Sequence, residues 1–399
     1  MFKNQLLILT QGDQMKSFGT IIGIKIGLAI FCACMALSAP ALAEDAKPAG
    51  LTLDEMKKAL GLSIYVQTGY TYNGNASSLT NVPGDPGSEN NLRGYDHEAN
   101  SFGLDLAEIV FAKDPATSVI GYKVKVSAGE TAKLMHATGL GTQPTGTANP
   151  ESFDITEAYI SYTAPIGKGL RLDMGKMATY VGAEVIEAID NPNYSRSFLF
   201  VFAEPTTHTG VKASYVFSDN VNASIHILNG WDNATDNNTG KCFGTSINVS
   251  AGDLFSAYIN YMRGPESDNN NHDQRSLLDL VATIKPVKPL SIILNYDNGK
   301  QDNSGASSVK WSGFAGIVKY DFSDTYSLSV RGESFDDKDG FRTGTSQRLT
   351  EVTVTPEIRL AGGLIVRPEY RHDSSGKQSF DNGTKKSQVT FALNAMYRW

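Results

Sequence analysis

The chain has 399 residues, of which 41% are hydrophobic, 19% charged and 10% aromatic, and its formal net charge is −7. This acidic balance argues against nucleic acid as a partner, because phosphate binding requires clustered cations. Beyond residue 43 no segment approaches the roughly 20 apolar residues that a membrane-spanning helix needs. The composition therefore excludes both a disordered chain and a helical membrane bundle.

The N-terminal segment has the form of a secretory signal peptide. Lys25 precedes an apolar run over residues 26–37, and Ala41-Leu-Ala has the small-x-small pattern that signal peptidase cleaves. We therefore expect residues 1–43 to be removed on export. Residues 1–14 precede a Met that already heads a complete signal, which makes them a candidate for an overcalled start.

The next segment, residues 44–60, is predicted to be an N-terminal periplasmic extension with a short helix over residues 51–60. The sequence does not distinguish a position in the periplasm from one inside a lumen. Cys242 is the only cysteine beyond the leader, so the exported chain has no internal disulfide and no cysteine-based metal site.

The last segment of the chain shows a strict period of two, the pattern of a β-strand with one apolar face. One face carries Val389, Phe391, Leu393, Ala395, Tyr397 and Trp399. The same alternation recurs at residues 62–72, 221–227, 255–261, 278–284 and 290–296. Each run is about ten residues long, which is the length that a tilted strand needs to cross a bilayer.

Short turns and long polar connections alternate along the chain. Short turns are predicted near residues 113–117, 165–169, 218–220, 251–253, 286–289, 323–325 and 361–363. Long loops are predicted at residues 74–98, 129–153, 178–206, 232–240, 265–274, 300–308, 336–348 and 374–386. This order predicts an all-β fold, a transmembrane antiparallel β-barrel of about 16 strands over residues 61–399, with short periplasmic turns and long outer loops. A secreted sandwich or solenoid has no reason to keep the alternation.

Several motifs resemble the OmpL-like beta-barrel porins of Gram-negative outer membranes. The resemblance is clearest in residues 182–198, in Thr207-His-Thr-Gly-Val, in Asn229-Gly-Trp-Asp-Asn and in Arg367-Pro-Glu-Tyr-Arg-His-Asp. It implies an outer-membrane porin, a water-filled channel for the passive diffusion of small hydrophilic solutes. Analogy with other sixteen-stranded porins implies a homotrimer in outer-membrane lipid. No cofactor and no metal are expected.

The C-terminal strand is also the expected signal for the barrel-assembly machinery. The residues that we expect to form this signal are Phe391, Leu393, Tyr397 and Trp399. Such barrels more often end in Phe, and Trp399 keeps an aromatic ring at that position.

Charged residues on the strand faces opposite the apolar ones are predicted to line the pore. Their number alone excludes a lipid-facing position, since each charge would cost roughly 2 to 4 kcal/mol near the midplane. The predicted pore-lining residues are Lys123, Lys125, Glu157, Arg171, Asp173, Lys212, Arg331, Glu333, Glu357, Arg359, Arg367, Glu369 and Arg371.

The third long loop, residues 178–206, is the predicted constriction, because a loop at this position folds inward in sixteen-stranded porins. Its candidate residues are Glu184, Glu187, Asp190, Tyr194 and Arg196. We expect its carboxylates to face Arg331, Arg359, Arg367 and Arg371 across the lumen, which would create a transverse field. The alternative is that these charges are ion pairs that stiffen the barrel.

Two other functions are known for outer-membrane barrels and are alternatives to a porin channel. A surface adhesin or receptor barrel would have a blocked lumen and no solute flux. An outer-membrane hydrolase is suggested only by His-carboxylate neighbours such as His97 and His372, which lack a nucleophile or metal motif, so no enzyme is expected. Acidic loops such as residues 268–273 lack the spacing of a calcium loop, and solvated turns account for them better.

Two places depart from a regular strand pattern. In residues 102–111 the apolar face changes phase near Glu108, which predicts a β-bulge. Pro356 and Pro368 fall in the middle of consecutive strands, where each removes a ladder donor, and a bulge or local widening is predicted there.

Overall fold

The computed structural model describes residues 52–75, 89–115, 119–137 and 152–399. The predicted leader, residues 1–43, lies outside the described residues. A short helix, α2 (Leu53–Leu60), precedes the first strand and falls within the segment for which the sequence predicts a helix. Among the described residues, no helix has the length and apolar character needed to cross a membrane.

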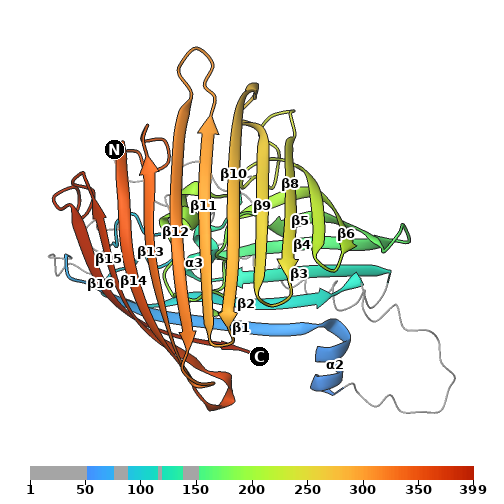
Figure 1. Cartoon of the computed structure of the whole chain (residues 1–399), viewed down its shortest axis with the longest axis horizontal. Helices are drawn as coiled ribbons and strands as arrows, with labels where there is room; N and C mark the ends of the chain where they lie inside the picture. The colour runs from blue at the N-terminus through green and yellow to red at the C-terminus, as the bar shows by residue number, and fades with distance from the viewer. Residues whose placement is uncertain (1–51, 76–88, 116–118, 138–151) are drawn as a thin grey trace, which may run out of the picture. The chain divides into compact units, whose positions relative to one another are not determined.

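Within these ranges, sixteen antiparallel strands form one closed barrel (Figure 1), which confirms the fold predicted from the sequence. Each strand pairs with its neighbours in the chain, and β1 pairs with β16. At this seam the backbone N–H groups of Ile64 and Trp399 each donate to the other's carbonyl oxygen, at 3.0 and 2.8 Å. The strands are β1 (Leu62–Asn73), β2 (Phe102–Lys113), β3 (Ile120–Ala128), β4 (Phe153–Ala164), β5 (Leu170–Ala178), β6 (Thr207–Ser218), β7 (Val221–Leu228), β8 (Cys242–Ala251), β9 (Phe255–Ser267), β10 (Asn270–Val287), β11 (Leu290–Gln301), β12 (Val309–Asp321), β13 (Tyr326–Asp337), β14 (Gln347–Arg359), β15 (Ile365–Ser375) and β16 (Ser387–Arg398).

Burial along the strands is the reverse of that in a water-soluble protein. Outward positions carry exposed apolar side chains, such as Ile160, Met174 and Leu393. Inward positions carry buried polar ones, such as Asp173 and Thr353. Because lipid can cover apolar side chains and closure pairs the backbone groups, this pattern is that of a membrane barrel.

Short turns join the strands at one end of the barrel, which is the lower end of β8 to β12 in Figure 1. Two of them are as short as residues 219–220 and 288–289. The connections at the other end are mostly longer, as predicted. The predicted loop at residues 265–274 is wrong, because β9 and β10 continue through it and leave only residues 268–269 as the turn. Strands that extend beyond a bilayer into water can carry polar residues, and this explains why the segment resembled a loop.

The two predicted irregularities take different forms. A register shift lies between Gln67 and Thr68 of β1, opposite residues 104–106 of β2, so the bulge forms a few residues before Glu108. Pro356 and Pro368 interrupt the ladder between β14 and β15, but the register is the same on both sides. The predicted bulge is therefore absent there, and the missing N–H groups only open the ladder.

The C-terminal strand presents its apolar side chains to the outside. Phe391, Leu393 and Tyr397 are exposed on the outer surface. The ring of Trp399 lies under the ammonium group of Lys57 from α2, which is 3.9 Å from the ring centre. A cation over an indole face is attracted by its quadrupole, so α2 and the last residue of the barrel stabilise each other.

Candidate functional site

The third long connection, residues 179–206 between β5 and β6, lies inside the barrel and is called the inner loop below. Arginines of β13 and β15, the two strands on either side of β14, bond to it. Arg331 of β13 donates to the Glu184 carboxylate at 2.8 Å and to the Ser195 carbonyl at 2.7 Å. Arg367 of β15 donates to the Ala188 carbonyl at 2.7 Å. The planar guanidinium suits such sites, because its several N–H donors lie in fixed directions.

Carboxylates on the same strands bind backbone N–H groups of the inner loop. Glu333 accepts from the N–H of Phe198 at 2.7 Å and of Leu199 at 2.5 Å. These groups stand at the start of a π-helical turn, Leu199–Ala203, whose free N–H groups favour a negative charge. Glu369 accepts from the N–H of Tyr194 at 2.7 Å. The loop is thus bound through its backbone as well as through its charged side chains.

The inner loop also reaches strands at the β1–β16 seam and beyond it. Glu187 pairs with Lys125 of β3. The Tyr194 hydroxyl donates to Asp105 of β2 at 3.0 Å. Asp190 pairs with Arg398 of β16, with its closest N···O distance at 2.5 Å. Contacts on both sides of the seam leave the loop little freedom to move as a flap.

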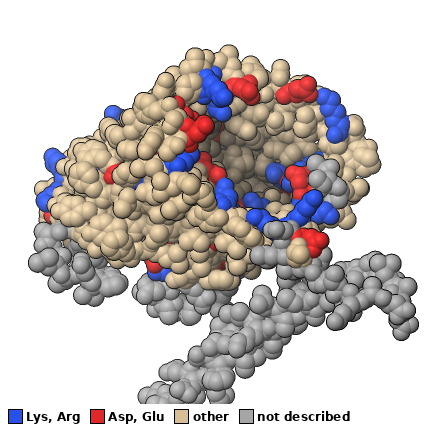
Figure 2. Space-filling model, turned by 90° about the horizontal axis from the view of Figure 1, so that it is seen from below, with Lys and Arg blue, Asp and Glu red and all other residues tan. Residues whose placement is uncertain are grey.

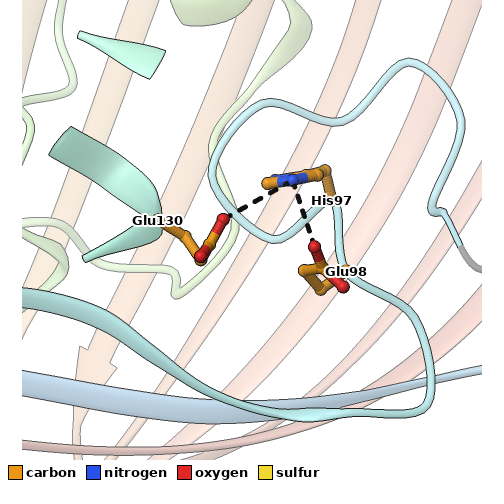
Figure 3. A group of neighbouring side chains, drawn as sticks. All are labelled: His97, Glu98 and Glu130. Atoms are coloured by element: carbon orange, nitrogen blue, oxygen red, sulfur yellow. Dashed lines mark ion pairs between the residues drawn. The ribbon is translucent and has the colours of Figure 1, made fainter. Parts of the chain in front are cut away.

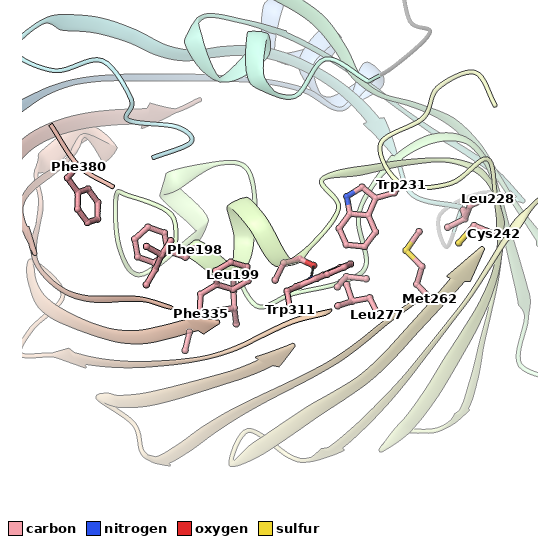
Figure 4. Close-up of a cluster of buried hydrophobic side chains, with 14 residues drawn as sticks. Phe198, Leu199, Leu228, Trp231, Cys242, Met262, Leu277, Trp311, Phe335 and Phe380 are labelled. Carbon is pink, nitrogen blue, oxygen red and sulfur yellow. Dashed lines mark hydrogen bonds between the residues drawn. The ribbon is translucent and has the colours of Figure 1, made fainter. Parts of the chain in front are cut away.

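Apolar packing complements these polar contacts. Phe198 and Leu199 of the inner loop belong to one buried cluster with Trp311 of β12 and Phe335 of β13 (Figure 4). The Trp311 indole N–H donates to the carbonyl oxygen of Ala203 at 3.2 Å. Apolar side chains of the loop therefore pack directly against the wall.

Arg196 organises the loop from within. Its guanidinium donates to the carbonyl oxygens of Val185 at 2.9 Å and Tyr194 at 2.5 Å, and also to that of Ile186. These bonds hold two parts of the loop together. Arg196, a predicted residue of the constriction, is itself buried.

The arrangement differs from the expected transverse field. Arg331, Arg367 and Arg371 touch the loop directly and are buried, so no open lumen separates them from it. Arg359 does not join them, because its partners are Asp321 at 2.8 Å and the adjacent Glu357. Arg331, Arg367 and Arg371 hold the loop against the wall.

Two apolar residues of the inner loop that meet water were not singled out from the sequence. Val185 is exposed and Ile189 is partly exposed, and among the charged candidates only Asp190 has an exposed side chain. The spacing of the charged residues is a sequence signal for this exposure. If every charged residue around Val185 has a partner in the fold, the apolar residues between them face the lumen.

Below the inner loop, five inward-facing cations have partly exposed side chains, and we call this set the basic vestibule. Their exposed fractions lie between 23% and 33%, whereas three of their carboxylate partners, Glu157, Asp173 and Glu357, are at most 5% exposed. The five are Lys123, Arg171, Lys212, Lys319 and Arg359. Figure 2, seen from the lower end of Figure 1, shows the barrel hollowed there, with charged side chains around the opening.

Distances within the basic vestibule are those of direct ion pairs. Lys123 lies 2.7 Å from Glu157, and Lys212 lies 2.8 Å from Asp173. The predicted pore-lining set therefore divides in two. Lys123, Arg171, Lys212 and Arg359 meet water, while Lys125, Glu157, Asp173, Arg331, Glu333, Glu357, Arg367, Glu369 and Arg371 are buried, most of them against the inner loop.

A separate group of ionisable side chains lies near the outer connections. His97 is 3.7 Å from Glu98 and 3.9 Å from Glu130 (Figure 3). All three are partly exposed and line one pocket together with Asp105 and Tyr194. Their separations are those of loose ion pairs, and exposed groups of this kind are stable in water without a ligand.

Closed strands, an inward-folded loop and a charged lumen define a protein of the outer-membrane porin class. The model of the family described as "Putative beta-barrel porin-2, OmpL-like" matches residues 59–399, and the chain belongs to this family. This membership favours the channel over a receptor barrel or an outer-membrane hydrolase. No curated protein matches the chain.

Solved structures share the fold at low sequence identity. The outer membrane channel DcaP of Acinetobacter baumannii is 12% identical over 85% of this chain and 96% of its own, with a TM-score of 0.56. An anion-selective porin from Comamonas acidovorans is 8% identical over 85% and 98%, with a TM-score of 0.56. The trimer form of OmpT from Vibrio cholerae, an outer membrane protein, is 13% identical over 85% and 98%, with a TM-score of 0.53.

Proposed function

We propose that this porin is a passive diffusion channel in which the inner loop sets the width and the basic vestibule favours small anionic solutes over cationic ones. The single observation that supports the charge preference is the difference in exposure within the ion pairs of the basic vestibule. The ammonium and guanidinium groups meet water, and three of their carboxylate partners, Glu157, Asp173 and Glu357, are at most 5% exposed, whereas Asp114 and Asp321 are 62% and 38% exposed.

A solute entering from the short-turn end would meet these cations first. Opposite charges less than 3 Å apart cancel much of each other's field at a distance, so the preference is expected to be modest. It should weaken further at high salt, because the Debye length falls to about 3 Å at 1 M ionic strength. A channel of this kind selects by size at the inner loop and by charge at the vestibule.

The test is the reversal potential across a planar bilayer under a KCl gradient. We expect the wild type to favour Cl⁻ over K⁺ in 0.1 M salt. A double substitution, Lys212→Gln with Lys123→Gln, should move the ratio toward cations, because Asp173 and Glu157 lose a screening partner. Arg348→Gln is the control, since that side chain is 66% exposed and pairs with Asp336 rather than with a vestibule carboxylate. An unchanged ratio in the double variant would refute the charge preference.

Export, assembly and oligomeric state complete the proposal. We propose that residues 1–43 are cleaved, that the C-terminal strand is read by the barrel-assembly machinery, and that three copies associate in outer-membrane lipid. N-terminal sequencing of protein from outer membranes should begin at Glu44. A native mass of three chains in mild detergent would support the trimer, and a single-chain mass would contradict it.

A further inference from the structure

Three carboxylates meet where both ends of the inner loop join the wall. Glu204 stands at the end of the loop, Asp279 on β10 and Asp297 on β11. One carboxylate oxygen from each lies within 4.8 Å of the others, and all three residues are buried. In the described part of the chain, none of the three forms an ion pair with Lys, Arg or His.

Several oxygens at this place lack any hydrogen-bond partner. Both carboxylate oxygens of Glu204 and both of Asp297 are buried and unpartnered, and so is the amide oxygen of Asn260. An unpaired buried carboxylate is costly, because burial removes its hydration and nothing replaces it. Four such oxygens in one place therefore call for a positive ligand or for protons.

Asp279 is held differently from its two neighbours. Its carboxylate accepts from Asn260 Nδ2 at 2.6 Å, from Asn295 Nδ2 at 2.7 Å and from the Gly182 N–H at 3.0 Å. Neutral donors of this kind fix the orientation of a carboxylate without neutralising its charge. Such a supporting shell is typical of metal-binding carboxylates.

The backbone of the inner loop is fitted closely around this group. Gly182 has φ +90°, and a Cβ placed on it would lie 1.9 Å from Glu204 Oε2. The next N–H, that of Ala183, donates to Asn295 Oδ1 at 2.8 Å. The beginning and the end of the loop therefore meet the same two strands around one set of oxygens.

We propose that Glu204, Asp279 and Asp297 bind one Ca²⁺ ion that fastens both ends of the inner loop to β10 and β11. The donor set is all oxygen, which suits a hard cation. Ca²⁺ accepts six to eight oxygens in flexible geometry, whereas Mg²⁺ demands a near-ideal octahedron, so Ca²⁺ fits irregularly placed carboxylates better. The site is independent of which solutes the channel conducts.

The experiment measures Ca²⁺ binding by titration calorimetry on the full chain refolded in detergent without lipopolysaccharide, which itself binds divalent cations. We expect one tight Ca²⁺ site per barrel, and a thermal unfolding midpoint that falls when EDTA is added. Asp297→Asn should abolish the tight site and make the midpoint insensitive to EDTA. Glu204→Gln should do the same, so a folding defect in one variant leaves the other as a test.

The matched control removes the other acidic group, by substituting Glu98→Gln together with Glu130→Gln. Those side chains are partly exposed, and their loss should leave the tight site intact. Two results would overturn the proposal. One is tight Ca²⁺ binding that persists in Asp297→Asn. The other is no tight binding in the wild type together with an EDTA-insensitive midpoint, which would mean that the carboxyls are kept neutral by protons.

Discussion

Arg331 of β13 and Glu184 of the inner loop form a buried ion pair 2.8 Å long. The same guanidinium lies 2.6 Å from Glu351 of β14 and donates to the Ser195 carbonyl at 2.7 Å. One side chain thus joins the wall to two points of the loop. Loss of this guanidinium would therefore break the contact of the wall with two points of the loop at once.

Arg331→Ala is expected to release the loop. It leaves Glu184 buried without its cation and Glu351 with only Arg371, 3.8 Å away, and breaking a buried pair costs roughly 3 to 5 kcal/mol. Single-channel recording should show a larger and noisier conductance than in the wild type. Arg331→Lys should recover only part of the effect, because an ammonium group lacks the fork that reaches two partners. Arg348→Ala, at the exposed rim, should behave as wild type. Equal conductance in all variants would contradict this role for Arg331.

Gly182→Ala is expected to destabilise the barrel. Its φ of +90° is strained for alanine, and the added Cβ would meet Glu204 Oε2 at 1.9 Å. Strain at such a position costs about 1 to 3 kcal/mol. Urea unfolding in detergent should show a lower midpoint than for Gly332→Ala, whose Cβ would have nothing within 4 Å. Equal midpoints for the two alanine variants would refute this role for Gly182.

The stability should also depend on pH through Glu204 when EDTA removes divalent cations. Burial, and then the charge of Asp279, raise the pKa of Glu204 well above its usual range. A carboxyl with a raised pKa in the folded state contributes most below its ordinary pKa, and that contribution is lost as the pH rises through the raised value. The wild type should therefore lose stability relative to Glu204→Gln as the pH rises. Parallel pH profiles would contradict the expectation.

Trp399→Ala should impair assembly more than Trp399→Phe. The backbone pairing of Trp399 with Ile64 survives both changes, but only an aromatic ring keeps the contact with Lys57. The fraction of folded barrel can be measured from its altered mobility on unheated gels. Lys57→Gln is the companion variant. If it reproduces the loss, the cation contact matters; if it has no effect while Trp399→Ala does, the ring acts through lipid or the assembly machinery.

The strand pattern was the part of this fold that the sequence encodes most directly. Period-two alternation at residues 387–398 has one physical cause, a wall with lipid on one side and polar groups on the other. The hairpin at residues 268–269 was mispredicted because β9 and β10 extend past the region where that contrast applies. Of the two forms predicted at the prolines, a bulge or a local widening, the bulge is absent, because Pro356 and Pro368 lie opposite each other and need no register shift.

The site was predicted less well for a different reason. Sequence alternation places Arg331 and Arg371 on the inner face, but it does not show what occupies the lumen next to them. The inner loop brings its own carboxylates and backbone groups, and these satisfy the arginines. The Glu204, Asp279 and Asp297 group was missed because its members come from three separate elements, with no local spacing to reveal them.

The contacts of the inner loop also constrain the order of folding. Its partners Lys125 and Asp105 lie on strands near the start of the chain, and Arg331 and Arg371 lie on strands near its end. The two ends of the sheet that carry these strands are joined only when β1 pairs with β16. Until then, buried guanidinium groups and carboxylates on one side lack their partners. Docking of the loop and closure of the barrel are therefore one cooperative event. The contacts of the loop stabilise only a barrel that has closed in the correct register.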